Sequence, residues 1–388
     1  MDTVDDIDST LEDEDSKDIK VSADDLEKTF LWGVDWTTET IINQIKKGNI
    51  DLDPDFQRRD AWTDKMRSSF IESILLGIPI PQIVLAEQNL DSGSKYIVLD
   101  GKQRLTTIMK FSQASQDYNH FELKQLPILT NLNKKTYKTL PVKDRNTFDN
   151  RTIRAVVIRG WSNESTLYAI FLRLNVGSLT LSPQELRKAL HPGKFVDYID
   201  NLSVTMNSYQ KVLGKNVPDR RMRDTELLLR IFGYKFNINA YHGNLKEFLD
   251  NTCEKLNDSW GNSQTQIEEY GMNLSTSIDF LESFLNSYPD LFKASRKFVQ
   301  NPKFNKAIFE VLAFNFTSEE IIDFIKQNEE DFIEKFETLK SNQDFNNSIN
   351  NTTKENSRLK TRFTLFAKML DSMNSDLKAT DNLPSFNF

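Results

Sequence analysis

Cysteine and histidine are scarce in this chain, and that scarcity excludes several kinds of chemistry. The 388 residues include one cysteine, Cys253, and three histidines. A single cysteine cannot form an internal disulfide, so we expect a reducing environment, the cytoplasm, and an inert, partly buried thiol. His120, His191 and His242 lie far apart without metal-ligand spacing, which argues against a structural zinc site and against an HNH-type nuclease centre.

Several familiar binding and targeting motifs are also missing. The chain has neither G-x-x-x-x-G-K-[ST] nor G-x-G-x-x-G, so it encodes neither a P-loop nor a Rossmann cofactor site. It has no G-x-S-x-G nucleophile elbow. No apolar run approaches the ~20 residues of a membrane span. The acidic amino terminus lacks an apolar h-region, so we expect neither a secretory leader nor a membrane partner.

The charge balance is acidic. The net charge is -8 and 27% of the residues are charged against 38% hydrophobic, which is a soluble globular balance without the overall footprint of a nucleic-acid binder. Basic residues do gather locally, as in the run 219–224, which is flanked by Asp219 and Asp224 and precedes an apolar helical pattern. We interpret this run as an ion-paired helix start, and a nucleic-acid contact is the alternative.

The length and patterning predict an α+β protein in three parts. Residues 1–28 are rich in Asp and Glu and should form a disordered tail. Residues 29–190 should form a small α/β domain, with helices at 38–47 and 63–77 and strands at 50–52, 82–87, 95–99 and 153–158. Residues 191–388 should form an α-helical domain, with one continuous helix over 319–339 and a loop over 341–355. Its many phenylalanines recur at helical spacing, which is typical of a core.

The most informative stretch is 95–108. Ile97 and Val98 suit a buried strand, Asp100-Gly101 breaks it, and apolar residues then recur at helical spacing from Leu105. Backbone N–H groups at a helix start lack partners and favour an anion. The sequence therefore predicts a phosphate-binding corner in which Arg104 supplies a planar fork of donors.

Other polar residues extend this candidate site. Gln57 and Arg58 precede the helix 63–77, and Asn175 and Arg187 follow the domain's last strand. Two converging arginines would hold a triphosphate, Thr106 and Thr107 would add hydroxyls, and Asp100 could bind magnesium together with phosphate oxygens. The alternative is structural: Asp100 caps a helix, Arg104 pairs with a nearby carboxylate, and Glu185 holds one of the arginines.

At these residues the chain resembles domain of unknown function 262, the amino-terminal domain of GmrSD-type modification-dependent restriction enzymes. The family motif Asp-Gly-Gln-Gln-Arg-Leu-Thr-Thr corresponds to residues 100–107. Phe56-Gln57-Arg58, Trp62, the run 73–81, and Asn175-Val176-Gly177 with Leu181 and 185–187 also resemble the family. The resemblance covers about 32–190. The order of elements is similar to the ParB/sulfiredoxin fold, whose members bind nucleotides at this corner.

The resemblance implies a set of site residues. It implies a catalytic group of Asp100, Gln103 and Arg104, with Asp100 also as the metal ligand. It implies that the nucleoside triphosphate is bound by Gln57, Arg58, Gly101, Lys102, Thr106, Thr107, Asn175 and Arg187. Lys102 departs from the glutamine usual in the family and takes the place of the sulfiredoxin cysteine, so that redox chemistry is absent.

The expected function is that of a nucleotide-binding, NTP-hydrolysing sensor or regulatory component of a bacterial restriction or antiphage system. GTP, CTP and ATP remain open as the nucleotide, with Mg²⁺ as the accompanying ion. Relatives that cleave DNA carry an HNH domain, so we expect this chain to depend on a separately encoded nuclease or effector. Two alternatives stay open: a non-enzymatic DNA-binding or interaction module, and weak metal-dependent DNA nicking by the ParB-like domain.

Overall fold

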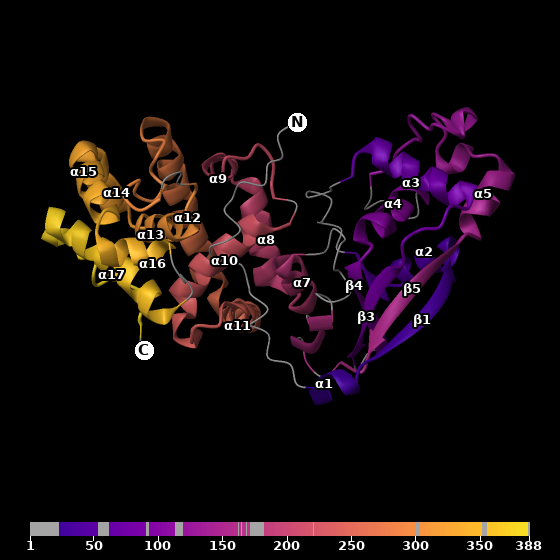
Figure 1. Ribbon diagram of the computed structural model, residues 1–388, viewed down its shortest axis with the longest axis horizontal. Helices are drawn as coiled ribbons and strands as arrows, with labels where there is room; N and C mark the ends of the chain where they lie inside the picture. The colour runs from indigo at the N-terminus through magenta and orange to yellow at the C-terminus, as the bar shows by residue number, and fades with distance from the viewer. Residues whose placement is uncertain are drawn as a thin grey trace. The chain divides into compact units, whose positions relative to one another are not determined.

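The computed structural model of the chain describes residues 23–52, 62–90, 93–112, 119–161, 163, 165–167, 169–170, 182–219, 221–299, 303–350 and 355–386 (Figure 1). The chain divides into two compact units. We call Ile19–Leu190 the amino-terminal unit and His191–Phe388 the helical unit. Because the first contains a mixed sheet with helices and the second consists mainly of helices, the predicted α+β class is confirmed.

The amino-terminal unit is built on a five-stranded mixed sheet in the order β1-β5-β3-β4-β2. Strand β3 lies between β4 on one side, which is antiparallel to it, and β5 on the other, which is parallel. The outer pairs are β1 with β5, antiparallel, and β2 with β4, parallel. The strands are β1 (Phe30–Thr37), β2 (Ile50–Asp51), β3 (Ile83–Leu90), β4 (Gly93–Asp100) and β5 (Thr152–Arg159).

Both faces of this sheet are buried. Ile83 and Leu85 belong to a cluster with apolar side chains from α2 (Thr38–Lys46), α3 (Asp64–Leu76) and α4 (Lys102–Ser112). Val84 and Ala86, between and beyond them on β3, belong to a second cluster with Leu186 of α7 (Pro183–Leu190). Since side chains alternate along a strand, the sheet is covered by helices on both sides. Helix α5 (Val142–Asp149) also belongs to this unit.

Helix α3 begins and ends where the sequence predicts. The Thr63 hydroxyl accepts a hydrogen bond from the Met66 N–H, which satisfies one of the helix's first donors. Gly77 ends the helix in the left-handed conformation, with φ of 77°. Within the unit, the buried Glu72 of this helix accepts hydrogen bonds from the backbone N–H groups of Ile128 and Leu129, at 3.0 and 2.7 Å. Helix α3 therefore holds the loop that follows α4.

Two elements near the start of the described chain differ from the predictions. Residues Ala23–Glu27, within the segment expected to be disordered, form the short helix α1. Strand β1 was not predicted, and its first half is exposed, with Phe30 56% and Leu31 55% accessible. An exposed edge strand lacks the alternation of buried and polar residues by which a strand is recognised in a sequence.

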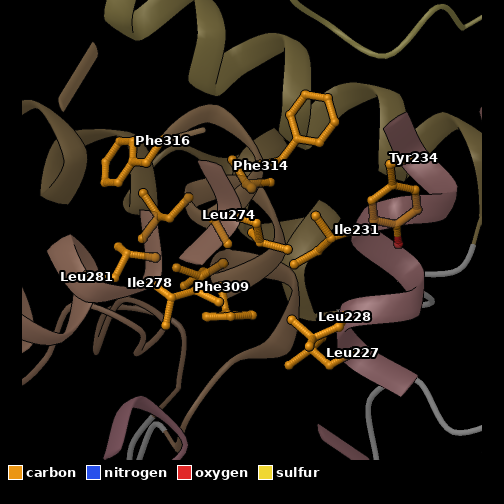
Figure 2. Close-up of a cluster of buried hydrophobic side chains, with 14 of the residues drawn as sticks. Leu227, Leu228, Ile231, Tyr234, Leu274, Ile278, Leu281, Phe309, Phe314 and Phe316 are labelled. Atoms are coloured by element: carbon orange, nitrogen blue, oxygen red, sulfur yellow. The ribbon is translucent and has the colours of Figure 1, made fainter. Parts of the chain in front are cut away.

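The helical unit consists of successive helices that surround one core. They are α8 (Lys194–Thr205), α9 (Asn207–Val212), α10 (Arg223–Phe236), α11 (Leu245–Asp258), α12 (Trp260–Ser287), α13 (Lys306–Asn315), α14 (Glu319–Gln327), α15 (Glu329–Lys340), α16 (Gln343–Asn350) and α17 (Asn356–Met373). Figure 2 shows part of this core, where apolar side chains of α10, α12 and α13 meet around Phe309. Cys253 is fully buried in the same core, whereas the sequence predicted a partly buried thiol.

Two predictions for this unit are wrong. The continuous helix over 319–339 is two helices, because Asn328 leaves the helical conformation at φ −135° and donates its side-chain amide to the Phe324 carbonyl. The predicted loop over 341–355 contains helix α16, in which Phe345 and Ile349 are fully buried one turn apart. At the start of this helix the Asn342 side chain accepts a hydrogen bond from the Phe345 N–H. This cap and the burial of Phe345 and Ile349 stabilise a helix in an otherwise polar segment.

Four charged side chains are buried in the helical unit as one network. Glu310 of α13 is fully buried and accepts hydrogen bonds from the Tyr234 hydroxyl at 3.1 Å and from Arg362 Nη2 at 3.1 Å. Arg230 Nη1 lies 3.4 Å from Glu310 and its Nη2 donates to Glu226 at 2.7 Å. The network therefore joins α10, α13 and α17.

None of the helices in the described part of the chain combines the length and the apolar character that spanning a membrane requires.

Candidate functional site

The candidate site lies where strand β4 ends and helix α4 begins. Ile97, Val98 and Leu99 are buried on alternating faces of the sheet, so β4 is fixed in place up to Asp100. Lys102 then begins the helix, and the Leu105 N–H donates to the Gly101 carbonyl at 2.9 Å. The N–H groups of the first turn of a helix have no carbonyl within that helix to bind. The predicted strand, corner and helix start are therefore present in the fold.

Gly101 makes the corner sterically possible. Its φ is 97°, in the range that L side chains rarely adopt. A Cβ at this position would lie 3.1 Å from Ile83 Cγ1 and 3.3 Å from Arg104 Nη2. The missing side chain thus lets the Arg104 guanidinium lie against the corner's backbone.

Arg104 is held by two contacts of the corner. Its Nη2 donates to Asp100 Oδ2 at 2.6 Å, and its Nη1 donates to the Pro81 carbonyl, which lies before β3. Only 11% of the Arg104 side chain and 23% of the Asp100 side chain are accessible. The pairing of Arg104 with a nearby carboxylate is the arrangement that the structural alternative expects.

The contacts of Arg104 with Asp100 and Pro81 leave other hydrogen-bonding groups of the corner available. A guanidinium has five N–H donors, and the two contacts of Arg104 use two of them. Asp100 accepts from Arg104 with Oδ2, which leaves the Oδ1 lone pairs. The corner can therefore offer an anion several fixed donors and offer a cation one carboxylate oxygen.

The other predicted residues of α4 divide into two groups. Lys102 and Gln103, on the first turn, are half-buried. Thr106 and Thr107 are buried, with 3% and 1% accessible, and the Thr107 hydroxyl donates to the Gln103 carbonyl at 2.7 Å. The accessible polar groups of the helix thus lie on its first turn, together with the backbone N–H groups.

Helix α7 begins with a capping box formed by Ser182 and Glu185. The Glu185 N–H donates to the Ser182 hydroxyl at 3.0 Å, and the Ser182 N–H donates to Glu185 Oε2 at 2.6 Å. Arg187 of this helix is buried and donates to Gln184 Oε1 at 2.7 Å. The other predicted members of the site, Gln57, Arg58 and Asn175, lie outside the described residues.

Two groups of the corner were not among the predicted site residues. The Pro81 carbonyl accepts from Arg104, and the Ile83 side chain forms the wall against Gly101. The sequence carries a weak indication of both, because Pro79 and Pro81 force an extended segment before β3. Across the described part of the chain, no three His, Cys, Asp or Glu side chains gather as a metal site, so any cation at Asp100 would need ligand oxygens as well.

Replacing Gly101 with alanine should destabilise the protein by about 1–3 kcal/mol, the usual cost of a residue held in a strained backbone region. The new Cβ also presses on Ile83 and on the Arg104 guanidinium. Urea unfolding of the variant measures the loss. Gly33→Ala is the matched control, because no atom lies within 4 Å of a Cβ there. Equal stability of the two variants would contradict the steric role of Gly101.

The fold and corner together define a class of domain: a small mixed sheet covered on both faces, with a strand-glycine-helix corner that presents an arginine and helix N–H groups. Residues 38–192 match the family described as GmrSD restriction endonuclease, N-terminal domain. This match confirms the resemblance seen in the motifs. No curated protein matches the chain.

Proposed function

We propose that the amino-terminal unit binds a nucleoside triphosphate at the corner formed by Asp100, Gly101 and Arg104. The observation that supports this most is the Arg104 guanidinium, which is fixed by Asp100 and Pro81 beside the start of α4 and keeps donors that those two contacts do not use. Fixed donors next to a helix start suit phosphate oxygens, because charge-assisted bonds and the helix dipole act on the same group.

Each residue of the corner has a role in this proposal. Arg104 and the first-turn N–H groups of α4 bind phosphate, and Lys102 adds positive charge. Asp100 Oδ1 binds Mg²⁺ jointly with phosphate oxygens, the usual way in which magnesium is held at nucleotide sites. Gln103, half-buried on the first turn, orients the attacking water in the hydrolysis that we propose. Gln57, Arg58, Asn175 and Arg187 complete the proposed site.

We further propose that the protein is the sensor or regulatory component of a bacterial restriction or antiphage system. The match to the GmrSD restriction endonuclease N-terminal domain supports a restriction system, with DNA as the final target. In the described ranges no cluster of His, Cys, Asp and Glu forms a metal centre of the kind that a nuclease uses. A separately encoded nuclease, controlled by nucleotide at the corner, would then cut the DNA.

Replacing Arg104 with alanine should weaken nucleotide binding at least about tenfold, since hydrogen bonds to a charged group contribute ~1.5–3 kcal/mol. Fluorescent GTP, CTP and ATP, each with Mg²⁺, would be titrated into wild type and variant, and phosphate release would be followed in parallel. Arg154→Ala is the matched control, because it also removes an Arg–Asp pair but lies on the exposed β1–β5 edge with Asp35. Circular dichroism would establish that both variants are folded.

The outcomes separate the proposal from its alternatives. Wild type that neither binds nor hydrolyses any of the three nucleotides would overturn it, as would equal binding by wild type and Arg104→Ala. DNA binding that persists without nucleotide and falls steeply with salt would favour the DNA-binding module. Nicking of supercoiled plasmid that requires metal and is lost in Asp100→Ala would favour weak nuclease activity of this domain.

A further inference from the structure

The negative charge of the chain is concentrated at its amino-terminal end. Residues 1–22 contain nine acidic residues and two lysines, so they carry seven of the eight net negative charges. The rest of the chain is close to neutral. Val4, Ile7 and Leu11 lie among these acids at the i, i+3, i+7 spacing that places residues on one face of a helix. This segment is therefore a polyanion with a short apolar stripe.

The helical unit contains a cavity of about 290 Å³ that suits such a segment. It lies among α9, the start of α10, the end of α12, residues 289–293 and Phe304, and Lys293 and Phe304 form an isolated β-bridge. Its volume is at the lower limit of small-molecule pockets, ~300–1,000 Å³, so it fits one or two side chains better than a whole nucleotide. The apolar part of its lining consists of Val212, Leu213, Leu285, Pro289, Phe292 and Phe304.

Three cations line the same cavity. Lys215 and Arg223 share one carboxylate, the buried Asp219, and Lys293 pairs with Asp290 at 2.8 Å. Burial alone would raise the pKa of Asp219, but Lys215 and Arg223 outweigh it and hold that pKa below its ordinary value. Arg223 lies 3.6 Å from Asp219 through Nε, and this buried Nε makes no hydrogen bond. The cavity thus has more cations than carboxylates to pair with them.

We propose that residues 1–22 of this chain dock in this cavity, with one of their aliphatic side chains on the apolar lining and their carboxylates on Lys215, Arg223 and Lys293. Burial of an aliphatic side chain against the apolar lining favours docking at this cavity. The ion pairs add specificity and make the docking depend on salt concentration. The docked segment would therefore compete with any other polyanion for binding to these three cationic side chains. This contact lies within the helical unit and does not depend on the nucleotide proposal.

A photocrosslinking amino acid at Leu11 in the full-length chain tests the proposal. Crosslinks within one chain should map to 212–215 and 285–304. Their yield should fall about two- to fivefold in Lys293→Gln, the range expected for loss of one exposed ion pair. It should also fall at 1 M salt, where the Debye length is ~3 Å. An added peptide of residues 1–22 should compete, and a scrambled peptide of equal charge should compete less.

Arg296→Gln is the matched control. Arg296 pairs with the same Asp290 as Lys293, at 3.2 Å, but does not line the cavity. Its crosslinking should equal that of wild type. Crosslinks that map to the amino-terminal unit, that join two chains, or that are unaffected by Lys293→Gln would each overturn the proposal. Equal competition by the scrambled peptide would also overturn it, because the apolar stripe would then have no role.

Discussion

Replacing Glu310 with alanine should lower the free energy of unfolding of the protein by about 3–5 kcal/mol, the cost of removing one partner from a buried ion pair. The change leaves the Arg230 and Arg362 guanidinium groups buried without their shared carboxylate, and it removes the acceptor of the Tyr234 hydroxyl. Those two arginines are among the largest fully buried side chains described. Urea unfolding followed by circular dichroism at 222 nm would measure the loss.

An exposed ion pair of the same unit supplies the control for Glu310. Lys211 and Glu282 lie 3.2 Å apart, with 62% of the lysine accessible, and Glu282→Ala should cost no more than ~1 kcal/mol. Glu310→Gln keeps the volume and one acceptor oxygen, so it should fall between the two. If Glu310→Ala costs as little as Glu282→Ala, the buried network does not hold α10, α13 and α17 together.

Replacing Phe332 with alanine should cost about 3–5 kcal/mol, the range for a fully buried phenylalanine. Its ring packs against Phe284, Phe316, Phe336 and Phe366, at centroid distances of 5.8, 5.9, 5.7 and 6.4 Å. These rings come from α12, the end of α13, α15 and α17. One truncation therefore opens a cavity where four segments meet, and thermal unfolding should show a much lower melting temperature.

Two further variants define the origin of the Phe332 effect. Phe332→Leu keeps much of the volume and should cost clearly less than alanine. Met272→Ala, at an α12 position that is 64% accessible, should change stability by less than about 0.5 kcal/mol. A Phe332→Ala variant as stable as Met272→Ala would mean that the neighbouring helices close the cavity completely.

Local chemistry made much of the fold predictable from the sequence. The limits of α3 follow from Thr63 and Gly77, and the start of α7 follows from Ser182 and Glu185, because each cap is a contact between residues three or four apart. Helix α16 was missed for the opposite reason. Its Phe345 and Ile349 stand among Asn and Ser residues, and only the buried environment supplied by other helices makes this polar segment helical.

The candidate site divides in the same way. The structural alternative predicted that Arg104 pairs with a nearby carboxylate, and the structure identifies that carboxylate as Asp100, one helical turn away, which the same alternative had assigned to capping the helix. The contact of Arg104 with the Pro81 carbonyl depends on the hairpin of β3 and β4, and the wall at Ile83 depends on its register. Such contacts join residues distant in sequence, so the local pattern of Pro79 and Pro81 indicates the extended segment but not the contacts themselves. The roles of Gln57, Arg58 and Asn175 stay predictions.

The strand order of the amino-terminal unit also sets the order in which it can form during synthesis. Strands β3 and β4 pair as a hairpin and can associate as soon as both have left the ribosome. Strand β1 emerges first, yet its neighbour in the sheet is β5, with Phe30 opposite Arg159. Translation adds ~5–20 residues per second. Strand β1 therefore lacks its partner strand in the sheet for several seconds after Phe30, Leu31 and Trp32 are made. The sheet that carries the Asp100 corner is therefore completed only when β5 is made.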